Sequence, residues 1–77
     1  GHVNFEAGAL IANHYNERLD KTIWAQVNGM RTNTGTFKFG ALVGDNSRIG
    51  ANAVLSPGTI LPKGSIVKRL ELIEQNN

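Results

Sequence analysis

The sequence lacks cysteine altogether, and it contains only two histidines among 77 residues. Without cysteine, neither a disulfide framework nor a thiolate metal site can stabilise the chain. A zinc site needs clustered His, Cys or carboxylate ligands, which two distant histidines, His2 and His14, do not provide. We therefore expect no metal site. Two histidines are also too few candidates to support a Ser-His-Asp catalytic arrangement.

Long apolar runs and clusters of like charge are also missing. A membrane span needs about 18 consecutive apolar residues, and no stretch of the sequence approaches this length. The net charge is +2 and the eight basic residues are scattered, whereas nucleic-acid binding usually shows a clustered basic stripe with interleaved aromatic residues. We expect a cytoplasmic protein that binds neither membrane nor nucleic acid.

The chain is short enough to form one domain at most. A domain of 77 residues buries a low fraction of its surface, so self-association would supply burial that the single chain lacks. Gly1 and His2 are typical of a tag remnant, and we place the domain at residues 3–77. The sequence does not begin with Met, which is compatible with its being a piece of a longer protein.

The sequence does contain a six-residue repeat. An apolar residue recurs at every sixth position: Phe37, Val43, Ile49, Leu55, Leu61 and Val67. A small residue recurs in the same period: Ala41, Ser47, Ala53, Thr59 and Ser65. Each small residue follows a Gly or an Asn: Gly40, Asn46, Asn52, Gly58 and Gly64. Gly and Asn enter left-handed backbone conformations most cheaply, so the pattern predicts a corner of the chain at each of these positions.

A period of six fits neither an α-helix, with about 3.6 residues per turn, nor a plain strand, with 2. It fits a parallel β-helix, in which each hexad is one short strand plus a turn and three hexads form a triangular coil of about 18 residues. The apolar residue then points into the prism, and the small residue fits the crowded corner. Upstream, Phe5 and Ile11 are six apart, with Gly8 and Ala9 at the corner, so the first coil begins near Val3.

The repeat is interrupted at residues 13–36. This interval holds two short extended segments, residues 22–27 and 30–35, on either side of Asn28-Gly29, the dipeptide best suited to a type I′ turn. We expect a protruding hairpin or long loop, which is either a solvated loop without a role or an arm that contacts a ligand or another subunit. We interpret Trp24 as such a contact, because a thin prism has little room for an indole.

After Val67 we expect the six-residue pattern to end. Leu70, Leu72 and Ile73, with charged residues between them, indicate a short closing turn of helix or a last strand over the open end of the prism. The expected fold class is therefore all-β: a parallel β-helix of about three coils, with one long inserted loop or hairpin and a short C-terminal cap.

The chain resembles the C-terminal left-handed β-helix domain of sugar-1-phosphate nucleotidyltransferases in two segments, VNFEAGALIANHY and TGTFKFGALVGDNSRIGANAVLSPGTIL. The family includes bifunctional enzymes that acetylate glucosamine 1-phosphate and then uridylylate it. Its first segment runs N-x-G-A-G-T-x-x-x-N and its second K-x-G-A-x-x-G-D-x-x-x-x-G. The resemblance covers residues 3–67 and implies a left-handed helix that assembles as a homotrimer.

The resemblance implies roles only where residues match. Asn4 corresponds to the Asn that contacts the sugar phosphate, and Asn13 to the Asn near the acetyl group of acetyl-CoA, the expected cofactor. Lys38 opens the K-x-G-A motif beside the site. Two alternatives stay open: asparagines often bond turn backbone, and Lys38, like Arg48, can be a solvated surface charge.

Three departures from the family pattern concern the chemistry. Glu6 replaces the Gly that stands two residues after the first Asn, and His14 replaces a Tyr, with Tyr15 one position later as the matching substrate contact. The catalytic His of the acetylating enzymes lies upstream of the segment present here, so His2 does not correspond to it. His14, with an ordinary pKa of roughly 6.5, is the weak candidate for a base, and its alternative is a surface histidine.

We therefore expect a transferase-related domain that binds a sugar phosphate or acyl-CoA between subunits near Asn4, Asn13 and Lys38. The alternative is a non-catalytic module that trimerises or regulates a partner domain, which the missing His favours. A carbonic-anhydrase-like β-helix is disfavoured because its zinc needs three histidines. Partly outward apolar residues would form the contact surface that a trimer buries: Phe39, Leu42, Val54, Ile60 and Ile66.

Overall fold

The computed structural model describes residues 2–76, which are all-β. None of these residues lies in a helix that is long and apolar enough to cross a membrane. The strands are short, from two to four residues each: β1 Asn4–Phe5, β2 Leu10–Ile11, β3 Trp24–Val27, β4 Met30–Asn33, β5 Ala41–Val43, β6 Arg48–Ile49, β7 Val54–Leu55, β8 Thr59–Leu61, β9 Ile66–Val67 and β10 Leu72–Ile73.

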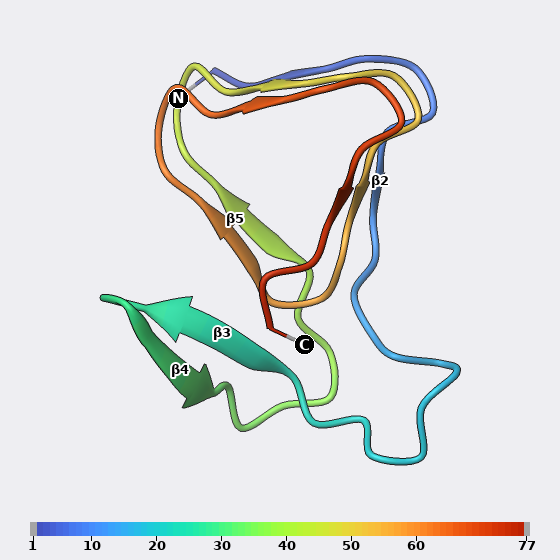
Figure 1. The fold of residues 1–77 in the computed structure, drawn as a ribbon, viewed down its shortest axis with the longest axis vertical. Coiled ribbons are helices and arrows are strands. Elements are labelled where there is room, and N and C mark those ends of the chain that lie inside the picture. The colour runs from blue at the N-terminus through green and yellow to red at the C-terminus, as the bar shows by residue number, and fades with distance from the viewer. Residues whose placement is uncertain (1, 77) are drawn as a thin grey trace.

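The chain passes around three sides of a triangle (Figure 1), and we call one such passage a coil. Strands β1, β6 and β9 pair in parallel on one side, β2, β7 and β10 on the second, and β5 and β8 on the third. Paired residues of the second and third coils are 18 positions apart, as in Arg48 with Ile66 and Val54 with Leu72. This parallel register is the one that the six-residue repeat predicts.

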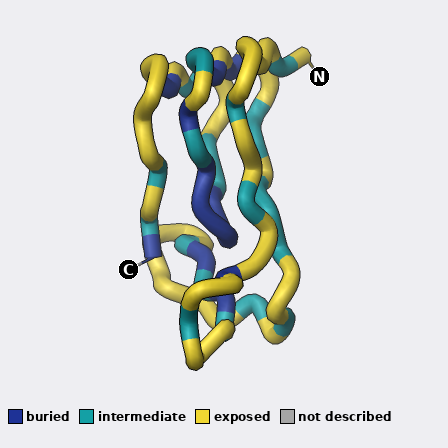
Figure 2. Tube along the Cα trace, turned by 90° about the vertical axis from the view of Figure 1, so that its right-hand side faces the viewer, coloured by how far each residue is buried: buried dark blue, intermediate teal, exposed yellow. Residues whose placement is uncertain are grey.

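The first coil has only two of its three sides. Among the described residues it contributes β1 and β2, and the insertion lies between β2 and β5, at the corner where the first coil passes into the second. Figure 2 shows the coils side by side, with buried residues concentrated in the middle one. Ile49, Ala53, Leu55 and Val67 form the core cluster, each no more than 3% exposed, because the repeat points them into the prism.

From Asn46 onward, residues in the left-handed conformation form corners at every sixth position. Asn46, Asn52, Gly58 and Gly64 have φ values between 59° and 82°. In the first coil, Gly8 has a φ of 78°, as its place in the repeat predicts. The small residues that follow three of these corners are fully covered: Ser47, Ala53 and Thr59. Covered small residues let the neighbouring coils approach closely at the corners.

The repeat extends further at its C-terminal end than the sequence suggested. Leu70 has a φ of 65° and occupies the next corner, and Ile73, six residues after Val67, is partly buried against the core. The prediction that the hexad is lost after Val67 is therefore wrong. A leucine is a poor residue for a left-handed corner, which is why the sequence did not reveal it.

Two predictions at the start of the second coil are also wrong. Phe37 is 64% exposed and lies outside the strands, because the chain has not yet rejoined the coil at that point. Gly40 is not among the residues with positive φ. At this point the chain returns from the insertion, and the Phe39 N–H donates a 2.8 Å hydrogen bond to the carbonyl of Asn13. This corner is therefore formed without a residue in the left-handed conformation.

The hairpin predicted within the insertion is confirmed. Strands β3 and β4 pair antiparallel, and both Asn28 and Gly29 have positive φ, as a type I′ turn requires. The hairpin is not wholly protruding, because β3 lies against β8 and Ile23, just before β3, is fully buried. Trp24 is partly buried, with the Arg31 guanidinium 4.1 Å from its ring centroid.

Of the two predicted closures, a turn of helix or a last strand, the structure has the strand, β10, and side-chain amides follow it at the C-terminal end. Gln75 both accepts a 2.8 Å hydrogen bond from the Ile60 N–H and donates a 2.9 Å bond to the Ile60 carbonyl. The buried Asn76 amide donates to the Gly58 carbonyl at 3.3 Å. Gln75 thus imitates a neighbouring strand along the outer edge of β8.

We predict that Gly58→Ala destabilises the fold far more than Gly64→Ala. Both glycines have positive φ, so alanine costs about 1–2 kcal/mol at either site. A Cβ at Gly58 would also collide with the carbonyl of Trp24, which adds about 1–3 kcal/mol, whereas a Cβ at Gly64 meets nothing within 4 Å. Denaturant unfolding of the two variants checks this difference, and equal losses would contradict the packing of the insertion against Gly58.

We predict that Leu70→Asn stabilises the fold. Leu70 is 72% exposed, so little burial is lost, and asparagine relieves about 1 kcal/mol of left-handed strain. The matched control is Leu42→Asn, at an exposed strand position without positive φ, where no gain is expected. Thermal melts of the two variants provide the measurement, and a lower melting temperature for Leu70→Asn would show that the corner is not strained.

Candidate functional site

An open groove runs across the outer face of the sheet formed by β1, β6 and β9. It has a volume of about 660 Å³ and is lined by twelve residues: His2, Asn4, Glu6, Asn46, Ser47, Arg48, Ile49, Gly50, Ile66, Val67, Lys68 and Arg69. Side chains alternate between the two faces of a strand, so the residues flanking the core positions point into this groove. Each coil therefore contributes its own row of outward groups.

The register places polar groups from all three coils next to each other. Asn4 pairs with Arg48, and Arg48 with Ile66, across the three strands. Two residues further along, Glu6, Gly50 and Lys68 take the corresponding places. A Cβ at Gly50 would collide with the backbone of Lys68 and Arg69, so glycine permits the close approach of the second and third coils.

The groove has an excess of positive charge. Arg48, Lys68 and Arg69 are exposed, and within residues 2–76 the structure shows no ion pair for any of them. Glu6 is the one carboxylate among the lining residues, and its Oε1 accepts a 3.0 Å hydrogen bond from the Ala51 N–H. Guanidinium and ammonium groups bind phosphate oxygens strongly, so the groove is suited to a phosphorylated ligand.

Of the residues implied by the resemblance, Asn4 alone lines the groove. Asn13, His14 and Lys38 are exposed at the base of the insertion. The Asn13 Oδ1 and His14 Nδ1 atoms are 3.1 Å apart, and Asn13 also binds the returning chain through its carbonyl. Since Asn4 belongs to β1 and Asn13 follows β2, a single chain places them on different sides of the triangle.

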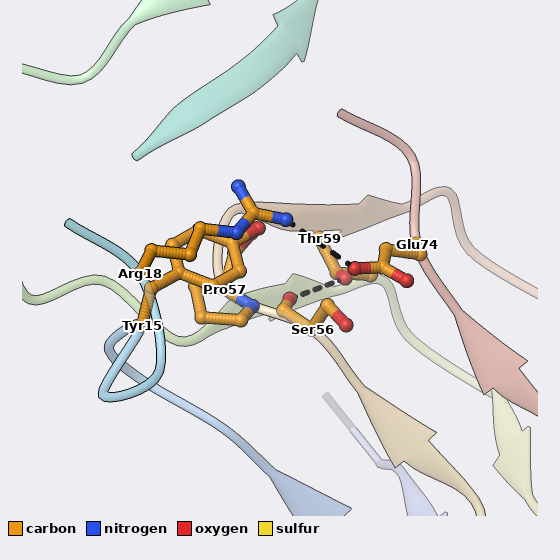
Figure 3. A network of polar contacts seen from close by, with 6 residues as sticks. All are labelled: Tyr15, Arg18, Ser56, Pro57, Thr59 and Glu74. Atoms are coloured by element: carbon orange, nitrogen blue, oxygen red, sulfur yellow. Dashed lines mark hydrogen bonds and ion pairs between the residues drawn. The ribbon is translucent and has the colours of Figure 1, made fainter. Parts of the chain in front are cut away.

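Tyr15 lies in the packing between the insertion and the coils (Figure 3). It is 4% exposed, and its hydroxyl donates a 3.4 Å hydrogen bond to the Pro57 carbonyl. The Arg18 guanidinium covers the ring at 3.6 Å from its centroid and also lies 3.6 Å from Glu74 Oε1. These contacts join the insertion to the turn after β7 and to the chain after β10.

The loop that follows Tyr15 is held together from within. The Lys21 ammonium donates hydrogen bonds of 2.9–3.2 Å to three carbonyls: those of Tyr15, Asn16 and Arg18. Hydrogen bonds from the side chain and the backbone of Thr22 hold the pKa of exposed Asp20 below its ordinary value. The start of the insertion is therefore an ordered segment with its own polar contacts.

Sequence reasoning missed Lys68 and Arg69 as groove residues. They lie after Val67, where the sequence analysis expects the repeat to end and a terminal cap to begin. Aligning the sequence in lines of 18 residues would have revealed the groove, since Lys68 then falls directly below Gly50, two columns from Arg48. Within residues 2–76 no three His, Cys or carboxylate groups gather in a way that could hold a metal ion.

Comparison with known proteins agrees with the resemblance in the sequence. No family model matches the chain. Over 57 residues, 73% of its length, the chain is 44% identical to the bifunctional sugar-1-phosphate nucleotidylyltransferase/acetyltransferase of Sulfurisphaera tokodaii. The matched region is 14% of the length of that protein. The chain is thus similar to a small part of a bifunctional transferase.

Proposed function

We propose that the chain is a left-handed parallel β-helix that supplies a binding site for a phosphorylated ligand, a sugar phosphate or an acyl-CoA, in a transferase. Three observations support this proposal. The strands pair in parallel with an 18-residue register, the corners are left-handed, and the matched relative has both nucleotidylyltransferase and acetyltransferase in its name.

The groove beside Asn4 is the observation on which this proposal is based. Its lining includes two amides, those of Asn4 and Asn46, and three cationic side chains, which is a set of groups suited to sugar hydroxyls and phosphate oxygens. We assign ligand binding to Asn4, Arg48, Lys68 and Arg69, and we assign them no proton transfer. The candidate base for acetyl transfer is His14, a weak candidate, or a residue outside this chain.

A homotrimer would complete the site, because Asn4 and Asn13 lie on different sides of one chain. The outer faces of the other two sides have the composition of a contact surface. Leu10, Val54 and Leu72 form an aliphatic row across β2, β7 and β10, and Leu42 pairs with Ile60 across β5 and β8. In the homotrimer these rows pack between subunits and place the groove of one subunit near Asn13 and Lys38 of the next.

The same aliphatic rows favour a second function, a non-catalytic module that trimerises or regulates a partner domain. Leu10 and Leu72 are 62% and 57% exposed, so the rows offer contact area whether or not the groove binds a ligand. The two functions differ in one testable respect. Only the first requires that a phosphorylated ligand stabilise the fold through the groove.

A thermal-shift titration with acetyl-CoA, CoA and glucosamine 1-phosphate tests the proposal. A ligand at 100 times its Kd stabilises the fold by about 2.7 kcal/mol, which is readily measured in a small domain. Removing a charged hydrogen-bonding partner in Arg48→Ala should raise the Kd about tenfold or more. Lys63→Ala, which removes an exposed cation outside the groove, is the matched control and should leave the Kd unchanged.

The outcomes separate the two functions. A shift that Arg48→Ala weakens and Lys63→Ala does not would support the binding site. If none of the three ligands shifts the melting temperature of the wild-type chain, the groove is not a phosphate site, and the non-catalytic module becomes the better account.

A further inference from the structure

The turn of the hairpin contains the one asparagine of the sequence that is followed by glycine, Asn28. Asparagine is a thermolabile residue. Its side-chain carbonyl carbon can be attacked by the backbone nitrogen of the next residue, and a side chain on that residue hinders the approach. Gly29 has no Cβ, so it allows this nitrogen to come close. Asn28 is therefore the asparagine with the least steric protection from its neighbour in sequence.

The structure leaves this turn open to solvent at the far end of the hairpin (Figure 1). Asn28 and Gly29 are both exposed, and a Cβ at Gly29 would meet nothing within 4 Å. Among residues 2–76 the Asn28 side chain has no hydrogen-bond partner. The hydrogen bond of a β-turn joins the residues on either side of its centre, so the Gly29 N–H is not part of it. Neither reacting group is therefore held in place by a bond.

The tip of the hairpin is also weakly packed. The Gly29 nitrogen has to swing toward the Asn28 side chain, so the reaction proceeds through local opening of the turn. Val27 and Met30 form the pair that closes the turn, and they are 44% and 70% exposed. Segments with few buried contacts open at the lowest free-energy cost. The base of the hairpin is anchored, in contrast, because Ile23 is fully buried.

Asn33, at the other end of the same hairpin, is protected. Its Oδ1 atom accepts a 2.8 Å hydrogen bond from the Gly35 N–H. The nitrogen that would attack it belongs to Thr34, whose N–H donates a 3.0 Å hydrogen bond to the Ile23 carbonyl. Both reacting groups are engaged in bonds, so Asn33 serves as an internal control for Asn28.

From these observations we propose that Asn28 is a site of spontaneous deamidation, with water as the co-reactant. The Gly29 nitrogen loses its proton and attacks Cγ of Asn28, a C–N bond forms, and the side-chain nitrogen leaves as ammonia. Water then opens the cyclic imide at either of its carbonyls and leaves aspartate or isoaspartate. The net change exchanges NH2 for OH, and nothing is oxidised or reduced. Neither residue lines the groove, so the modification does not depend on the proposed function.

The two products differ in their effect on the hairpin. Aspartate followed by glycine suits a type I′ turn as well as asparagine does, so this product keeps the hairpin. Isoaspartate directs the main chain through its side-chain carbon, which lengthens the turn between Val27 and Met30. The pairing nearest the turn is then lost, while the buried Ile23 keeps the base of the hairpin in place.

Incubation of the folded chain, followed by trypsin digestion and mass spectrometry, tests the proposal. Trypsin cleaves after Lys and Arg, so Asn28, Asn33 and Asn46 appear in separate peptides, residues 22–31, 32–38 and 39–48. We expect the mass gain of NH2-to-OH exchange first in residues 22–31, at Asn28 when the peptide is fragmented. The gain should be faster at higher pH, because the attacking nitrogen must lose its proton. A fresh sample digested in parallel measures any reaction during digestion.

Asn28→Gly is the matched variant, because Gly-Gly also suits a type I′ turn but has no side-chain amide. Its peptide should keep its mass. Hydrogen exchange at Met30 should become faster in the aged isoaspartate form of the wild type and stay unchanged in the aged variant.

Two results would overturn the proposal. One is a peptide 22–31 that keeps its mass in the folded chain while it gains mass in a chain incubated in denaturant, since the turn would then protect Asn28. The other is earlier modification of Asn33 or Asn46 than of Asn28 in the folded chain.

Discussion

The left-handed corner at every sixth residue is the constraint on which the rest of this structure depends. Parallel strands cannot be joined by a tight turn and need a long crossover, which three successive corners provide within 18 residues. Each corner also ties one coil to the previous one. The N–H groups of Asn52, Gly64 and Leu70 donate to the carbonyls of Ala7, Asp45 and Ala51 at 2.8–3.1 Å. The bend of the chain and the stacking of the coils therefore form together.

The same spacing determines what the outer surface can do. Because positions 18 apart become neighbours, residues from two or three coils form a row on each side of the triangle. One side thus gains a groove with cationic groups beside Asn4, while the other two gain aliphatic rows. The insertion lies between β2 and β5 and is held against the coils by Tyr15 and Arg18. The proposed ligand binding and the proposed association through the sides thus use different surfaces.

Sequence reasoning reached the strand register and the hairpin because both depend on local signals, the six-residue repeat and the Asn28-Gly29 turn. It failed where contacts between distant segments determine the conformation or the burial of a residue. Leu70 adopts a left-handed conformation that its side chain disfavours, because its N–H is bonded to the neighbouring coil. Tyr15 is buried by Pro57, 42 residues away, which no local pattern can reveal. Lys68 joins the groove only once the coils are stacked.

Disulfide trapping tests the 18-residue register most directly, since the chain has no cysteine of its own. Arg48 and Ile66 are paired in neighbouring strands, which lie about 4.8 Å apart, so Arg48→Cys combined with Ile66→Cys is within disulfide reach. Lys68→Cys in place of Ile66→Cys moves the second thiol about 6.6 Å along the strand and out of reach. The account predicts that the first pair oxidises within one chain and the second stays reduced. Oxidation of the second pair in preference to the first would contradict the register and the fold built on it.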